Sequence, residues 1–290
     1  MAAAVLPLFA AADDEPPIIA KARAFLGSES DLANVHALHM TGTMTAVFNG
    51  DPASKRSAKL DIVFQKPWEE SLLRIAPDAI DRRVLDGYDG WFLQQRRGPG
   101  DPAQFDPRRP ETFTILGVDQ VRMLRADTWE NLYFYRGIDR VGGTMKDLGP
   151  ATIDGVKCEE VEFAHTDRVV YDRYFDLETG RLVFTRSKSG AQIREKGYQV
   201  VAGIKFPRVI TIEEPTDGKG TLTTVTILDH IAVNEDLPES YFATPPPPLP
   251  VEYQPSPAAP APAAKAAAPA PAVPSSAASA APPATPPPQP

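Results

Sequence analysis

The sequence has a single cysteine, Cys158, among its 290 residues, and it has no long apolar run. One cysteine excludes an intramolecular disulfide framework and any cysteine-rich zinc site. Because no stretch of 18 or more residues is apolar, we expect no transmembrane span. The net charge is −8 and no stripe of lysine and arginine is present, which argues against a nucleic-acid partner.

The motifs that mark common catalytic sites are also missing. The chain has no G-x-S-x-G elbow, no P-loop, no G-x-G-x-x-G and no H-E-x-x-H. His36 and His39 form an H-x-x-H pair, but in a strand this spacing places the two side chains on opposite faces. We therefore expect no metal site, no cofactor and no enzymatic activity, with an enzyme of unrecognised site as the least favoured class.

The two ends of the chain differ from the body. Residues 2–12 read AAAVLPLFAAA and precede the acidic run 13–15, as at the end of a secretory signal peptide. We interpret residues 1–12 as the remnant of a truncated signal peptide and expect an exported, periplasmic protein. The alternative is a frayed apolar N-terminus of a cytosolic protein.

The C-terminal segment, residues 244–290, contains 18 of the 32 prolines and 15 alanines. Proline has no backbone N–H to donate to a neighbouring strand, and alanine side chains bury little apolar surface. The composition therefore predicts that this segment is a disordered tail. Its role is either that of a spacer or tether, or that of an overhang without function.

The body between the ends predicts a mostly β domain over residues 18–242. Residues 18–26 (IIAKARAFL) have helical spacing, and residues 112–136 form a second helical region. Two runs of alternating strands, one on each side of that region, are punctuated by turns such as Asp154-Gly155 and Ser189-Gly190. About a dozen strands are too many for a flat sheet, which favours a curved antiparallel half-barrel with helices over its concave face. Two small domains that divide near Pro110 are the alternative.

The order of these elements resembles the outer-membrane lipoprotein-sorting family, the LolA/LolB-like periplasmic carriers. The resemblance covers residues 18–242 and rests on IIAKARAFLGSESDLANVHALHMTGTM, VLDGYDGWFLQ, ATIDGVKCEEVEF, YFDLETGRLVFTR, GYQVVAGIKFPRVITIEE and LPESYFATP. It implies an unclosed barrel of about eleven antiparallel strands with helices as a lid. It also implies a hollow that binds the acyl chains of a lipid or lipoprotein without making or breaking bonds.

If such a hollow exists, same-face strand residues and the lid should line it. Strand alternation indicates an apolar lining, although the same residues would equally serve as an ordinary core under the helices. The candidate ligand-binding residues are Met44, Phe48, Ile62, Phe64, Leu73, Ile75, Leu85, Trp91, Leu93, Phe113, Leu116 and Met123.

The resemblance and the expected apolar hollow lead to one hypothesis about function and one main alternative. The favoured function is a periplasmic carrier of lipid or lipoprotein acyl chains. The alternative is a scaffold or sensor of the same fold that binds an envelope protein, which the Pro/Ala tail favours.

Overall fold

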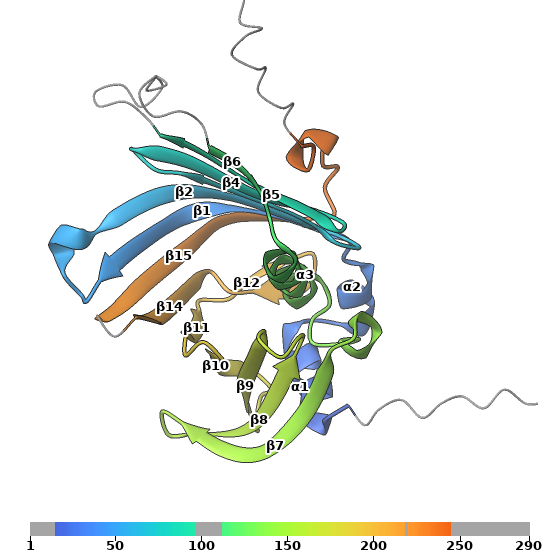
Figure 1. Ribbon diagram of the computed structural model, residues 1–290. Coiled ribbons are helices and arrows are strands. Elements are labelled where there is room, and N and C mark those ends of the chain that lie inside the picture. Colours follow the sequence, from blue (N-terminus) through green and yellow to red (C-terminus); the bar gives the residue numbers. More distant parts are fainter. Residues whose placement is uncertain (1–14, 97–111, 218–219, 245–290) are drawn as a thin grey trace, which may run out of the picture. The chain divides into compact units, whose positions relative to one another are not determined.

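One large antiparallel sheet organises the chain (Figure 1). The computed structural model describes residues 15–96, 112–217 and 220–244, so the expected signal-peptide remnant and the tail after Thr244 lie outside the described residues. No helix within the described ranges is both long and apolar enough to cross a membrane.

Within the described ranges, the sheet has 13 strands in the order β6-β5-β4-β3-β2-β1-β15-β14-β11-β10-β9-β8-β7, and β12 pairs with β13 in a separate ribbon. Each half is a meander of sequence neighbours, except that β11 pairs with β14 across the β12–β13 ribbon, and the first and last strands, β1 and β15, join the halves. The strands are Ala37–Phe48 (β1), Arg56–Gln65 (β2), Glu69–Ile75 (β3), Ala79–Asp86 (β4), Asp89–Arg96 (β5), Thr112–Ile115 (β6), Thr144–Ile153 (β7), Val156–Ala164 (β8), Val170–Asp176 (β9), Leu182–Ser187 (β10), Gln192–Lys196 (β11), Gln199–Val201 (β12), Ile204–Phe206 (β13), Val209–Thr216 (β14) and Gly220–Val233 (β15).

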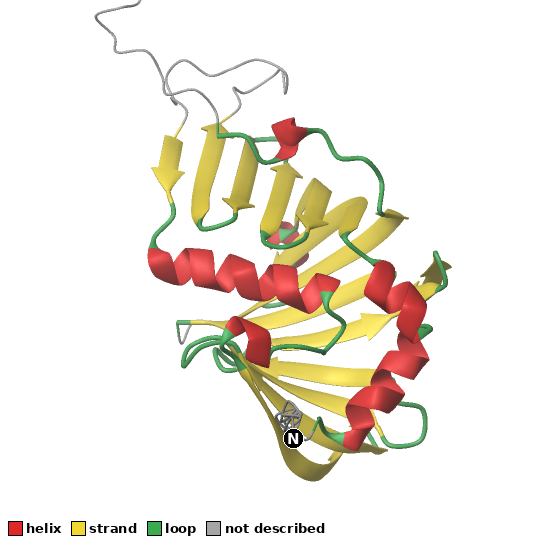
Figure 2. Cartoon of the chain, turned by 90° about the vertical axis from the view of Figure 1, so that its right-hand side faces the viewer, coloured by secondary structure: helices red, strands yellow, loops and turns green. Residues whose placement is uncertain are grey.

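In the part of the chain that the structure describes, three α-helices lie on the inside of this curved sheet. They are Pro17–Leu26 (α1), Glu29–Asn34 (α2) and Val118–Leu132 (α3). Figures 1 and 2 show α3 running across the hollow of the sheet, with α1 and α2 beside it. Single-turn 3-10 helices occur at Pro52–Ser54, Asp139–Val141 and Glu239–Tyr241.

The prediction of a mostly β, open antiparallel sheet is confirmed, but the strand count of about eleven is wrong. One reason is residues 112–115, which we assigned to a helical region. They form strand β6 because they pair with the sheet edge at β5, where Trp91 lies opposite Ile115, and the helix begins only at Val118.

The convex face of the sheet has its own apolar cluster. Val63, Val84 and Trp91 are buried there together with Phe242, which follows the last 3-10 helix. Arg82 donates hydrogen bonds of 2.8 Å to the carbonyl oxygens of residues 240 and 241, and its guanidinium lies 5.7 Å from the Trp91 ring. The segment after β15 therefore covers the outside of the sheet rather than the hollow.

Candidate functional site: an amphipathic cavity under α3

Helix α3 is held over the sheet by one apolar stripe. Val121, Leu124 and Leu132 are buried at helical spacing, and Trp129 between them is fully buried. At its N-terminus the Gln120 side chain accepts a hydrogen bond of 3.0 Å from the backbone N–H of residue 117. The helix contacts β2, β3, β4 and β5, so its packing fixes the roof of the space below.

The chain leaves α3 through a backbone conformation that places two aromatic rings in the hollow. Phe134 and Tyr135 have φ angles of 49° and 71°, which cost non-glycine residues of the order of 1 kcal/mol each or more. The buried Arg23 of α1 holds this turn by donating to the carbonyl oxygens of Tyr133 (3.1 Å) and Phe134 (2.6 Å). Arg23 also forms a bidentate pair with Glu29 of α2, at 2.8 and 2.7 Å.

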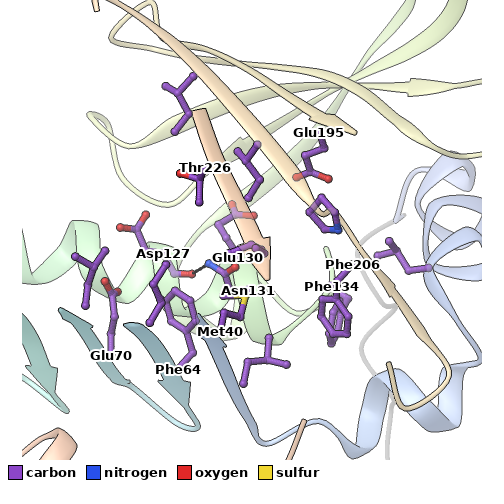
Figure 3. Close-up of a pocket in the computed structure, with 18 of the residues that line it drawn as sticks. Met40, Phe64, Glu70, Asp127, Glu130, Asn131, Phe134, Glu195, Phe206 and Thr226 are labelled. Atoms are coloured by element: carbon purple, nitrogen blue, oxygen red, sulfur yellow. Dashed lines mark hydrogen bonds between the residues drawn. The ribbon is translucent and has the colours of Figure 1, made fainter. Parts of the chain in front are cut away.

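A cavity of about 300 Å³ lies between α3 and the concave face of the sheet (Figure 3). Its sheet side is largely apolar, and its helix side is largely polar. The residues that line it are Leu26, Leu38, Met40, Ile62, Phe64, Glu70, Leu72, Arg83, Asp127, Glu130, Asn131, Phe134, Tyr135, Glu195, Lys205, Phe206, Pro207, Ile210, Ile212, Thr226 and Leu228.

The polar wall comes mainly from one face of α3. Asp127, Glu130 and Asn131 follow i, i+3, i+4 spacing, which places their side chains together on the helix surface. Figure 3 shows these three side chains above Phe64 and Glu70 of the sheet. The cavity is thus amphipathic, with an apolar floor and a carboxylate-rich roof.

Two carboxyl groups compete for one cation at the edge of this cavity. Arg83 Nη2 lies 3.0 Å from Glu70 Oε1 and 3.7 Å from Asp127 Oδ2. Burial, followed by the nearby charge of Asp127, raises the pKa of Glu70 to about 8. Burial likewise raises the pKa of Asp127 to about 6, against the opposing effect of Arg83. Glu70 is therefore protonated at neutral pH, and its buried Oε2 atom has no hydrogen-bond partner among the described residues.

Glu130 has the opposite environment. Burial disfavours its charge, but Arg173 and His165 outweigh that effect and hold the pKa of Glu130 below its usual value. His165 Nε2 lies 2.6 Å from Glu130 Oε1, and Arg173 pairs with the other carboxylate oxygen. The Arg173 guanidinium lies 5.1 Å from the Tyr135 ring and 4.8 Å from the Phe163 ring. Glu130 thus remains an anion, and its charge is neutralised by Arg173 on the side away from the cavity.

The structure brings two of the predicted lining residues, Ile62 and Phe64, into this cavity. Met44 lies opposite Ala58 and Thr226 on the same face of β1 as Met40, but further along the strand and outside the cavity. Phe48 is at the strand end and is 37% exposed.

Three other predicted lining residues accompany the first half of α3. Leu85 packs against Val121 and Leu124, with Leu116 beside them. Leu116 and Met123 line a second cavity of about 280 Å³, and Arg83 borders both cavities. These residues are on the concave side but do not line the main cavity.

The remaining five predicted lining residues point to the convex face, so their assignment to the hollow is corrected. Ile62 pairs with Leu72 and Phe64 with Glu70, and alternation therefore turns the neighbouring side chains of β3 outward. In the next hairpin Leu85 pairs with Gly90, so residues 91 and 93 face away from Leu85. The five residues are Leu73, Ile75, Trp91, Leu93 and Phe113.

Sequence reasoning missed the charged half of the site. Asp127 and Glu130 stand with Asn131 at i, i+3, i+4 spacing in α3, which gives one polar face, and that spacing was a usable signal. Glu70 and Glu195 gave no comparable signal, because glutamate in a short strand is ordinary at a solvent-exposed position. Within the described ranges no group of three or more histidine, cysteine, aspartate or glutamate side chains is arranged to hold a metal ion.

Comparison with known proteins shows which solved structures have a similar fold. No protein-family model matches the sequence, and no curated protein matches it significantly. A DUF1329 family protein from Desulfovibrio piger has a TM-score of 0.50 at 11% identity, over 78% of this chain and 95% of that chain. A LolA superfamily protein from Nitrosomonas europaea has a TM-score of 0.51 at 13% identity, over 78% and 96%.

The protein therefore belongs to the class of open antiparallel half-barrels that have a helix across the hollow. Its fold is similar to that of the LolA superfamily protein from Nitrosomonas europaea, so the resemblance in the sequence is confirmed at the level of the fold.

Proposed function

We propose that the protein is an exported carrier that binds an acyl chain of a lipid or lipoprotein in the cavity under α3, without catalysis. The observation that carries the proposal is the amphipathic cavity itself: an apolar floor of strand side chains beneath a polar helix. Burial of each methylene group contributes about 0.8 kcal/mol, so a short chain segment supplies useful affinity.

The size of the cavity limits what it holds. About 300 Å³ is at the lower end of the range of ligand sites, roughly 300–1,000 Å³. The cavity takes one chain segment in this conformation, and a larger ligand requires α3 to move away from the sheet. The class of ligand is therefore a single chain with a polar end, which would lie against the carboxyl groups of the roof.

Native mass spectrometry of the gently purified protein tests this function. We expect additional mass that dissociates as lipid or acylated peptide at higher collision energy. A protein that is always free of ligand, and that also fails to bind fluorescent fatty acids, would contradict carriage of acyl chains. That result would favour the alternative, a scaffold or sensor that binds an envelope protein.

A further inference from the structure

A separate cavity of about 350 Å³ lies on another side of α3 and has a different chemistry. Its walls come from helix α3, the turn before β3, the 3-10 helix Asp139–Val141 and the turn that follows β8. The residues that line it are Trp68, Arg122, Arg125, Ala126, Val141, His165 and Thr166. Three of these side chains are basic, and no aspartate or glutamate is among them.

Arg125 is the central residue of this basic cavity. Its guanidinium lies 4.6 Å from the ring of Trp68 and 4.6 Å from the ring of Tyr88. Two aromatic rings hold the guanidinium in place and leave its N–H donors free, since the interaction uses the charge and not the hydrogen-bonding edge. Within the described part of the chain, no carboxylate forms an ion pair with Arg125.

The neighbouring charges add to the positive field. Arg122 and Arg168 both pair with Asp119, at 3.7 and 2.7 Å, so one carboxylate serves two arginines. His165 uses its Nε2 atom to contact Glu130 behind the wall. The cavity therefore combines a pre-positioned, unneutralised guanidinium with a surplus of cations around it.

We propose that this basic cavity binds a phosphate group, with Arg125 as the principal contact. A planar guanidinium with free donors matches two phosphate oxygens, and such charge-assisted pairs are among the stronger hydrogen bonds in proteins. Thr166 lines the same cavity and adds a hydroxyl group, although its Oγ1 atom already accepts from the backbone N–H groups of Arg168 and Val169.

This inference goes beyond acyl-chain binding and does not depend on it. The basic cavity and the amphipathic cavity under α3 border the helix through different residues, Arg125 and Ala126 for the first and Asp127 for the second. The phosphate could belong to a small dissolved phosphoester or to a lipid headgroup at a bilayer surface, and two arms of one experiment distinguish these sources.

The first arm titrates inorganic phosphate into the full chain by calorimetry at low ionic strength. We expect saturable binding, and at least tenfold weaker binding in Arg125→Gln. Arg194→Gln is the matched control, because Arg194 also lies over an aromatic ring (4.7 Å from Phe184) but is paired with Asp154 and is outside the cavity. Arg125→Lys keeps the charge without the planar fork, so we expect intermediate affinity.

The second arm measures co-sedimentation with vesicles that contain phosphatidic acid in phosphatidylcholine. Binding that Arg125→Gln abolishes assigns the phosphate to a headgroup, and phosphate binding without vesicle binding assigns it to a dissolved ligand. The proposal is overturned if the wild-type protein binds neither probe. It is also overturned if a folded Arg125→Gln variant, checked by circular dichroism, binds phosphate as tightly as Arg194→Gln.

Discussion

At the scale of the residue, Glu70 makes stability depend on pH. Its raised pKa, about 8, means that the folded protein keeps a proton that the unfolded chain loses near pH 4.5. Stability from this group is therefore complete below about pH 4.5 and is lost as the pH rises through 8. We expect the free energy of unfolding to fall by about 3 kcal/mol more in the wild type than in Glu70→Gln between pH 6 and pH 9.

Urea denaturation at several pH values measures this difference. Glu213→Gln is the matched control, since it makes the same substitution at an exposed position on β14. Parallel pH curves for wild type and Glu70→Gln would show that Glu70 is ionised in the folded protein at neutral pH.

Individual residues also show which side-chain positions the sequence predicts and which it does not. Ile62 and Phe64 were placed correctly in the hollow by alternation along one strand. Trp91 was placed on the wrong face, because the pairing of Leu85 with Gly90 in the next hairpin decides which residues share a face. The alternation of side chains within one strand can be read from the local sequence. Which residues of two neighbouring strands share a face depends on the register set by the turn. The residues of the turn do not fix that register to better than one residue.

At the scale of the element, Arg23 joins α1, α2 and the end of α3. It pairs with Glu29 and caps the carbonyl oxygens of Tyr133 and Phe134. The Arg23 guanidinium holds the pKa of Glu29 below its usual value, mainly through their hydrogen bond. We expect Arg23→Ala to lower the free energy of unfolding by about 3 kcal/mol, because buried acceptors lose their donor.

Lys21→Ala on the same helix is the matched control, since Lys21 is exposed and, among the residues that the structure describes, its side chain donates a hydrogen bond only to the carbonyl oxygen of Leu177. It should cost less than about 1 kcal/mol. Equal effects of the two substitutions in urea denaturation would mean that the three helices are not held together by Arg23.

The elements differ in how far the sequence predicts them. Most strands were predicted because turns such as Asp154-Gly155 are marked by residues that favour positive φ, and here Asp154 and Gly155 have φ angles of 50° and 81°. Strand β6 was missed because four residues beside a helix have too little pattern of their own, and only the edge of β5 makes them a strand. The position of α3 over the hollow depends on tertiary contacts, and no local sequence pattern predicts it.

At the scale of the whole molecule, the pairing of β1 with β15 argues against two domains that divide near Pro110. Strands from both halves of the chain form one continuous sheet through this pair, from Leu38 opposite Val233 to Phe48 opposite Leu222. We expect a single cooperative thermal transition, with equal calorimetric and van't Hoff enthalpies. Two separated transitions would show that the halves fold independently.

The central claim is that the cavity under α3 holds an acyl chain, and a pair of substitutions on neighbouring strands tests it most directly. Ile212 of β14 lines the cavity, whereas Ile227 of β15 lies between the lining residues Thr226 and Leu228 and is 42% exposed on the other face. Ile212→Trp fills the cavity, and Ile227→Trp adds the same bulk outside it. In a fluorescence titration with a dansyl-labelled fatty acid, we predict at least tenfold weaker binding for Ile212→Trp and wild-type binding for Ile227→Trp. Equal, wild-type affinity in both folded variants would contradict the account.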